Sequence, residues 1–151
     1  MISTILSLAI ASVALAIPVP AASGQPAAYG LMAIHSGDAR VQYHQIGLTS
    51  DVKLSFTQTQ GFKFDLLSDG QLVVADVNYP GTVHMQSDGS LQLVDGAISD
   101  KFVVNEDQQL CLNNSASFVA CMDDGLVYYT GAGEVSCKET VGIDLRAIAM
   151  P

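Results

Sequence analysis

Short apolar runs alternate with turn residues along most of the chain, beginning at Tyr29. The runs are rich in Val, Leu, Phe and Tyr, and residues such as Gly, Asp, Asn and Ser separate them, which is typical of short β-strands joined by turns. No window carries apolar side chains at a convincing helical spacing. We therefore predict about twelve strands between Gly30 and Ile148. They centre on Met32, Tyr43, Leu54, Phe64, Val73, His84, Leu91, Val103, Cys111, Val119, Tyr128 and Leu145.

The middle of the chain contains a repeat that is built around aspartate. Asp69, Asp88 and Asp107 each lie between two apolar runs and follow one another at intervals of 19 residues, and Asp124 comes 17 residues later. Glycine follows all of them except Asp107. Asp-Gly between alternating apolar runs indicates a β-hairpin, because glycine accepts the positive φ that a tight turn requires. The repeat therefore predicts successive hairpins, each too small to bury its own apolar face.

An all-β fold with many short strands has sheet edges whose unpaired backbone groups must be protected. Closure of the strands into a barrel or a nearly closed architecture removes those edges. Six hairpins of about 20 residues would fill a β-trefoil, so a β-trefoil-like fold or closed barrel is the first prediction. A two-sheet β-sandwich is the alternative.

The N-terminal segment has a different character from the rest of the chain. Residues 1–16 carry no charged side chain and contain a short apolar run that ends in small residues, and Pro18 follows closely. This run is shorter than the roughly 20 residues that cross a bilayer, and it is typical of a signal peptide, with cleavage after residue 16 or as late as residue 22. We predict a short flexible lead over residues 17–28 and a single domain over residues 29–151. No later segment is apolar enough to span a membrane, so we expect secretion without a membrane anchor.

The net charge of the chain excludes some classes of binding partner. Charged residues make up only 14% of the chain, but the formal net charge is −9. An acidic surface argues against nucleic acid, whose phosphates require Lys and Arg, and against anionic membrane surfaces.

The cysteines and one sequon fit a secreted protein. Cys111, Cys121 and Cys137 are an odd number, so one thiol stays free or pairs outside the molecule. Asn113-Asn114-Ser115 is an N-glycosylation sequon, which belongs on a surface turn.

Catalytic and metal-binding patterns are weak. His35, Ser36 and Asp38 offer the residue types of a nucleophilic triad, but their sequence fits a turn between two strands. The histidines and cysteines lack the spacing of a metal site, and a turn role explains the aspartates better than acid–base catalysis or calcium binding. We therefore predict no enzyme activity, no cofactor and no metal.

Sugar binding is the remaining chemistry that the aromatic residues allow. The chain has no Trp, but Tyr79, Tyr128 and Tyr129 could supply an aromatic platform. Alternation along a strand would direct one of the adjacent tyrosines inward and the other outward. The competing hypothesis is that all three fill the barrel and its rim.

Motifs at both ends of the domain resemble known families. Phe118-Val119-Ala120-Cys121, a short aromatic strand, Ser136-Cys137 and an alternating last strand resemble the C-terminal domain of PIR-type fungal cell-wall mannoproteins. The opening Ala33-Ile34-His35-Ser36-Gly37 resembles that of PhiA-type fungal cell-wall proteins. The resemblance implies a disulfide between Cys121 and Cys137 and a free thiol at Cys111. From the residues alone, pairing of Cys111 with Cys121 across a turn near Ala116 stays open.

The resemblance also implies a function. We expect a non-enzymatic, secreted protein of the fungal cell wall or cell surface that associates with wall polysaccharide or wall proteins. A soluble secreted lectin-like binder or effector is the alternative, and a secreted hydrolase is a third hypothesis. The PIR repeat used for ester attachment to glucan contains Gln-Ile-x-Asp-Gly-Gln, of which only Asp69-Gly70-Gln71 is present here, inside a predicted hairpin.

Overall fold

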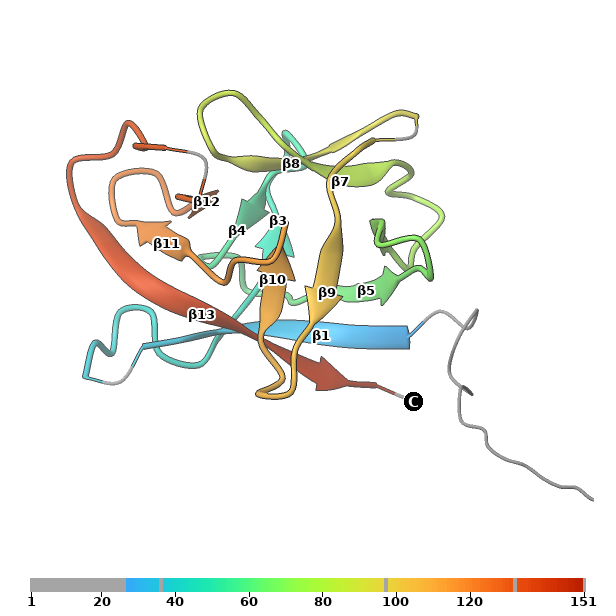
Figure 1. Cartoon of the computed structure of the whole chain (residues 1–151). Helices are drawn as coiled ribbons and strands as arrows, with labels where there is room; N and C mark the ends of the chain where they lie inside the picture. The colour runs from blue at the N-terminus through green and yellow to red at the C-terminus, as the bar shows by residue number, and fades with distance from the viewer. Residues whose placement is uncertain (1–26, 36, 97, 132, 151) are drawn as a thin grey trace, which may run out of the picture.

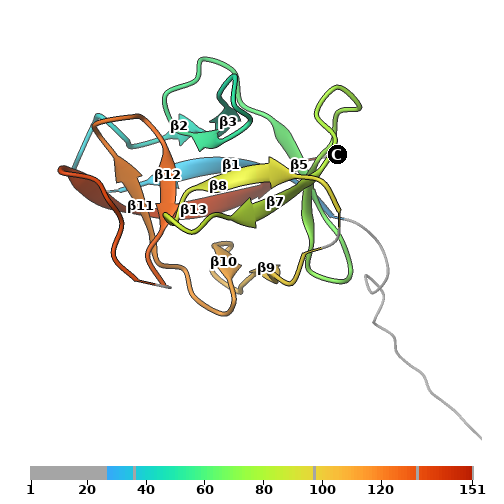
Figure 2. The ribbon, with the colours of Figure 1, turned by 90° about the horizontal axis from the view of Figure 1, so that it is seen from above.

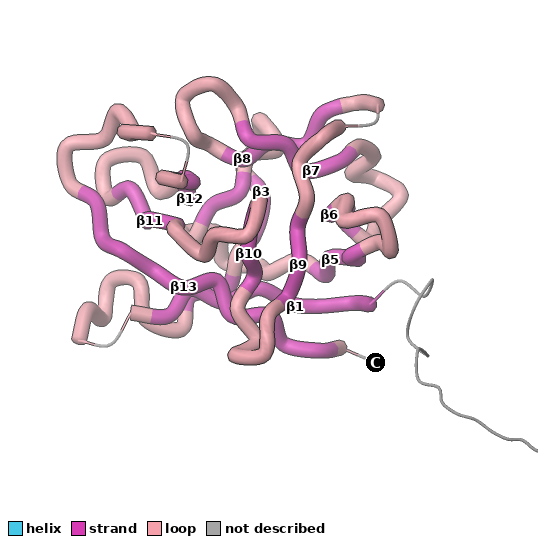
Figure 3. Tube along the Cα trace, in the orientation of Figure 1, coloured by secondary structure: helices cyan, strands magenta, loops and turns pink. Residues whose placement is uncertain are grey.

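The computed structural model describes residues 27–35, 37–96, 98–131 and 133–150. Within these residues every regular element is a strand and none is a helix, as the alternating pattern predicted (Figure 3). There are thirteen strands. They are β1 (Ala27–Ile34), β2 (His44–Gln45), β3 (Gly47–Leu48), β4 (Leu54–Ser55), β5 (Lys63–Leu66), β6 (Leu72–Val74), β7 (Thr82–Met85), β8 (Leu91–Val94), β9 (Phe102–Val104), β10 (Leu110–Leu112), β11 (Phe118–Cys121), β12 (Val127–Tyr129) and β13 (Thr140–Ala149).

Nine of the strands form one antiparallel sheet in the order β12-β11-β13-β1-β5-β6-β7-β8, with β2 added to β1. The two ends of this order approach each other, because Ser90 and Tyr128 form an isolated antiparallel bridge. In addition, the Tyr129 amide donates to the Gly89 carbonyl oxygen at 2.8 Å. The sheet is therefore nearly closed and barrel-like, which confirms the predicted all-β class and excludes the two-sheet sandwich. Two small sheets, β3–β4 and β9–β10, lie on opposite sides of it (Figures 1 and 2).

The first and last strands of the domain run side by side. β1 pairs with β13 from Tyr29 opposite Ala149 to Ile34 opposite Asp144 (Figure 1). β1 begins at Ala27, which pairs with Leu66 of β5, so the predicted flexible lead over residues 17–28 is wrong for its last two residues. The predicted signal peptide and the rest of the lead are outside the described residues.

The predicted hairpins are present, and Asp69 and Asp88 act in their turns, whereas in the third repeat Asn105 Oδ1 accepts the amides of Asp107 and Gln109. Asp69 Oδ1 accepts a hydrogen bond from the main-chain amide two residues later at 3.0 Å, and Asp88 Oδ1 does so at 2.9 Å. Gly70 and Gly89 both have a φ of 91°, which suits glycine, and Gln108 takes the same place in the third repeat with a φ of 63°. Equivalent main-chain bonds close the three turns, from Leu67 N to Gln71 O, from Gln86 N to Ser90 O and from Asn105 N to Gln109 O.

A further turn of this kind was missed by the sequence analysis. The Thr49 amide donates to the Lys53 carbonyl oxygen at 2.9 Å, and the Val52 amide donates back to Thr49 at the same distance. Val52 has a φ of 56°, although β-branched residues rarely adopt a positive φ. This turn has the same backbone bonding as the three turns of the aspartate repeat, but its sequence lacks Asp-Gly and so gave no signal.

One predicted strand centre, Tyr43, is wrong. The main-chain carbonyl of Asp38 accepts bonds from the amides of Val41 and Gln42, which coil the chain into a turn there. Tyr43 has a φ of 65° in that turn, and the strand begins only at His44. Each of the other predicted centres lies within a strand.

The core fills the inside of the barrel. Its largest side chains with almost no exposure come from nearly every part of the chain: Phe56, Phe64, Phe102, Ile46, Leu54, Leu72, Leu91, Leu110, Leu112, Leu145, Val41 and Val83. Among the described residues, no helix is long and apolar enough to cross a membrane.

Candidate functional site

The adjacent tyrosines of β12 point to opposite faces of the strand, as alternation predicted, but both are buried. Tyr129 is 4% exposed within the main core, and Tyr128 is 5% exposed in a smaller cluster with Cys121 and Leu126. Their expected role as an open aromatic platform is therefore wrong. The reason is that the outer face of β12 is covered, since Val135 and Cys137 pack against the cluster that contains Tyr128.

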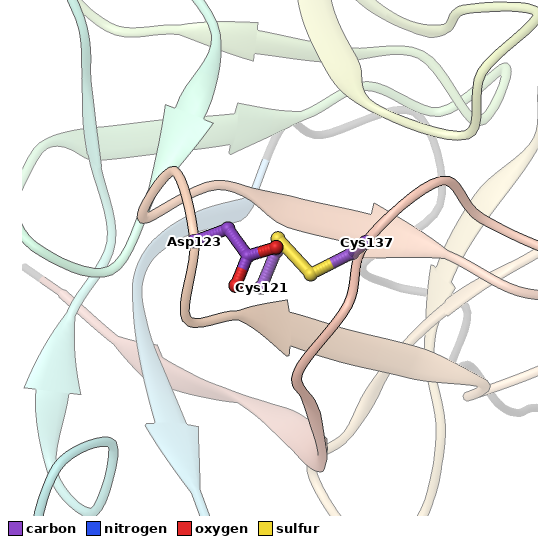
Figure 4. A group of neighbouring side chains, drawn as sticks. All are labelled: Cys121, Asp123 and Cys137. Atoms are coloured by element: carbon purple, nitrogen blue, oxygen red, sulfur yellow. A yellow bond between two sulfur atoms is a disulfide. The ribbon is translucent and has the colours of Figure 1, made fainter.

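The segment that covers Tyr128 is residues 133–139, which we call the strap. A disulfide between Cys121 of β11 and Cys137 holds it, with 6.0 Å between the two Cα atoms (Figure 4). Next to the disulfide, Asp123 Oδ2 accepts a hydrogen bond from the Lys138 amide at 3.0 Å. The Met122 amide donates to the Glu139 carbonyl oxygen at 2.9 Å. The strap is thus fastened to the β11–β12 hairpin by one covalent link and two hydrogen bonds.

The hydroxyl of Tyr128 is also occupied. It donates a hydrogen bond of 2.6 Å to Asp124 Oδ2, while Asp124 Oδ1 accepts the Leu126 amide at 2.9 Å. Burial is the main cause that raises the pKa of Tyr128 well above its ordinary value, and the hydrogen bond to the Asp124 carboxylate is the second cause. Tyr128 therefore stays protonated and serves to hold the turn of the β11–β12 hairpin.

The disulfide settles the pairing of the cysteines in favour of Cys121 with Cys137. The alternative pairing of Cys111 with Cys121 is wrong, because β10 pairs with β9, whereas β11 pairs with β12 and β13. Cys111 is a free thiol that is 7% exposed, and Asn105 Nδ2 lies 3.6 Å from its sulfur. Burial raises the pKa of the Cys111 thiol, so it is poorly placed to react or to link two copies of the chain.

Among the described residues, one group of donor atoms has the compactness of a metal site: the two disulfide sulfurs and an oxygen of Asp123, all within 4.8 Å of one another (Figure 4). These donors do not fit a cation. The sulfurs are bonded to each other and are not thiolates, and the carboxylate already accepts the Lys138 amide. The group is therefore a structural fastening of the strap.

Tyr79, the third predicted tyrosine, is half-buried. Its ring meets that of Phe62 edge to face, with 4.9 Å between the ring centroids and 89° between the ring planes. Phe62 in turn lines a mostly apolar hollow of about 270 Å³. The other lining residues are Gly30, Leu31, Met32, Gln45, Gly61, Lys63, Ile148 and Met150.

This hollow brings together residues that sequence reasoning did not single out. Met32 of β1 and Ile148 of β13 meet in it because the two terminal strands pair, and Gln45 lies opposite Met32 on β2. Ile148 and Met150 remain 43% and 44% exposed. No local motif could have predicted the hollow, since its lining comes from both ends of the domain.

The sequon occupies an exposed turn after β10, where it was expected. Asn113 has a φ of 50°, and its Oδ1 accepts the Lys101 amide at 3.1 Å. The side-chain oxygen is thus held by the protein, while the residue as a whole is exposed.

His84 lies against a buried carboxylate. Its Nδ1 lies 2.7 Å from Oδ2 of Asp100, a carboxylate that is only 8% exposed and that also accepts the Met85 amide at 2.9 Å. His44 instead bonds the Phe56 carbonyl oxygen at 3.0 Å. The rings of His84 and His44 therefore have separate partners.

Comparison with known proteins shows similarity to a distant relative. The chain is 33% identical over 169 residues to an uncharacterized but2-like protein of Schizosaccharomyces pombe, an alignment that covers 99% of this chain. The chain spans 42% of the length of that relative. No protein-family model and no solved structure matches the chain.

Proposed function

We propose that this chain is a non-enzymatic protein of the fungal cell wall or cell surface that associates with wall polysaccharide or wall proteins. The observation that carries the proposal is the disulfide-fastened strap. Disulfides persist in oxidising compartments outside the cytosol, and here the bond seals the aromatic strand β12 rather than exposing a reactive thiol. This arrangement suits a durable extracellular domain.

Three further features support the proposal. The exposed position of Asn113 leaves room for a glycan at the sequon. The net charge of −9 favours solubility and neutral or basic partners. The apolar hollow beside Phe62 combines a concave surface with the side chain of Gln45, which suits binding more than acid–base chemistry.

Fractionation of fungal cells tests the proposal. An epitope-labelled copy of the full chain should be present in purified walls and should be released from them by hot detergent or by mild alkali. A known wall protein should appear in the same fractions, and a cytosolic marker should be absent from them. Recovery from the culture medium alone would contradict wall association and would support the soluble lectin-like alternative. Recovery from the cytosol would contradict both.

Glycosylation is tested with the same material. Treatment with an N-glycosidase should increase the mobility of the wild-type chain, and an Asn113→Gln variant should migrate like the treated protein. If N-glycosidase does not change the mobility of the wild-type chain, the sequon no longer supports secretion.

A further inference from the structure

Tyr43 is the only aromatic side chain among the strongly exposed large apolar residues of the part of the chain that the structure describes. It is 67% exposed, and its φ of 65° lies in the left-handed region. A bulky residue is unfavourable there, and such strain is often associated with functional positions. Glycine would adopt this positive φ without strain, so the backbone conformation does not explain why the residue is a tyrosine.

The turn that carries Tyr43 is held by several bonds. The Tyr43 amide donates to the Ala33 carbonyl oxygen at 2.8 Å, which attaches it to β1. The Gln42 amide donates to the Asp38 carbonyl oxygen at 3.0 Å, and Gln42 Oε1 accepts the His35 amide. The exposed ring is therefore attached to a well-bonded loop rather than to a loose one.

The same loop carries an arginine that is paired with two carboxylates. Arg40 binds Asp38 through Nε at 3.0 Å and Nη2 at 2.8 Å, and its Nη1 lies 2.8 Å from Oε2 of Glu139. The Arg40 guanidinium and amide lower the pKa of Asp38 to about 2. Asp38 therefore remains a hydrogen-bond acceptor in an acidic medium, and its carboxylate retains acceptor capacity beyond these bonds.

A shallow hollow of about 420 Å³ lies on this loop and is lined by Gly37, Asp38, Ala39, Gln42 and Tyr43. It thus combines an exposed aromatic ring, a carboxylate and a side-chain amide. A sugar ring offers the matching surfaces, namely a face of C–H groups that can lie on an aromatic ring and hydroxyl groups that bond to carboxylates and amides.

We propose that the loop 37–43 binds a sugar unit of a neutral polysaccharide, with Tyr43 as the stacking platform and Asp38 and Gln42 as hydrogen-bonding partners. The inference deepens the proposed function and rests on it for the source of the ligand. A neutral polymer is favoured because the net charge of −9 would repel an anionic one. Sequence reasoning missed this site because the alternating pattern placed Tyr43 inside a strand.

Binding to insoluble particles tests the proposal. The full chain should be retained on at least one of three probes, β-glucan, chitin or mannan, with little difference between low and high salt. Tyr43→Asn should weaken retention about tenfold, because Asn tolerates the left-handed backbone but lacks the ring. Tyr43→Phe keeps the ring and should stay close to wild type. Val77→Ala, which alters a side chain that is 94% exposed elsewhere, is the matched control.

The saccharide site would be overturned by no retention on any of the probes, or by equal retention of wild type and Tyr43→Asn. Binding that depends on Tyr43 only with isolated wall proteins would also overturn it, in favour of a protein contact. These failures are separate from that of the proposed function. A chain that is present in walls but binds no saccharide refutes only the site, and Tyr43-dependent binding by a chain found solely in the medium refutes only the wall location.

Discussion

The hydroxyl of Tyr129 donates a hydrogen bond of 2.8 Å to the main-chain carbonyl oxygen of Leu112, 17 positions earlier in the chain. Both residues are buried, and the bond joins β12 of the barrel to the end of the small β9–β10 sheet. The same carbonyl accepts the Ser115 amide at 3.0 Å, within the turn that leads to β11. A side chain expected to bind ligand thus connects two sheets.

Removal of this hydroxyl should destabilise the fold. Tyr129→Phe should lower the free energy of unfolding by about 1 kcal/mol, because a buried hydrogen bond is lost while the ring packing is kept. Urea unfolding of wild type and variant measures the difference. Tyr43→Phe, at an exposed ring, is the control and should change little. Equal loss in the two variants would show that the bond to Leu112 contributes nothing specific.

The strap disulfide should contribute strongly to stability. The cysteines are separated by 16 positions, and a loop of this size corresponds to about 3 kcal/mol in the chain-entropy account. A Cys121→Ala, Cys137→Ala double variant should therefore unfold at lower urea concentration. Reductant should destabilise the wild type and leave the double variant unchanged. Peptide mapping without reductant should recover Cys121 joined to Cys137, and a fragment joining Cys111 to either one would contradict the structure.

Asp38 should make the stability depend on pH in the acidic range. Its pKa is lowered from an ordinary value of 3.8 to about 2 in the folded state, chiefly by the hydrogen bonds from Arg40. Its contribution is therefore complete above about pH 4 and is lost as the pH falls towards about 2. The effect should be small because the pair is exposed. Unfolding midpoints across this range should fall more steeply for wild type than for Asp38→Asn, and parallel profiles would refute the coupling.

Two glycines form a matched test of the strap contact. Gly89 and Gly96 have φ values of 91° and 89°, so alanine is strained at both. A Cβ at Gly89 would lie 2.9 Å from Val135 Cγ1 and 3.0 Å from the Tyr129 carbonyl oxygen, whereas a Cβ at Gly96 would meet nothing within 4 Å. Gly89→Ala should therefore cost about 1–2 kcal/mol more than Gly96→Ala in urea unfolding. Equal costs would mean that neither the Val135 side chain nor the Tyr129 carbonyl group resists the added methyl group.

The hairpin turns show why part of the fold could be predicted. Asp69 and Asp88 accept hydrogen bonds from amides only two residues away, and the adjacent glycines supply the positive φ. The turn can therefore be predicted from a few consecutive residues. The turn at Thr49–Lys53 uses the same backbone with Val52 at the strained position, and it was missed because surrounding contacts, not local preference, hold it there.

The candidate sites show the opposite case. Alternation correctly directed Tyr128 and Tyr129 to opposite faces of β12, but it could not show that the strap covers the outer face. Tyr43, conversely, was assigned to a strand and is in fact an exposed ring on a turn. In each case exposure depends on a segment distant in sequence or on a hydrogen-bonded loop that the apolar pattern does not encode.

The sequence by itself determined the all-β class and the positions of the Asp-Gly hairpins, because strand alternation and turn chemistry act over a few neighbouring residues. The tertiary structure decided the closure of the sheet between Ser90 and Tyr128, the burial of the thiol of Cys111 and the exposure of Tyr43. The tertiary structure also places Cys121 beside Cys137, a pairing that the residues alone left open and that resemblance to wall proteins implied. These features require the strands to be packed, since each depends on which distant segments share a face.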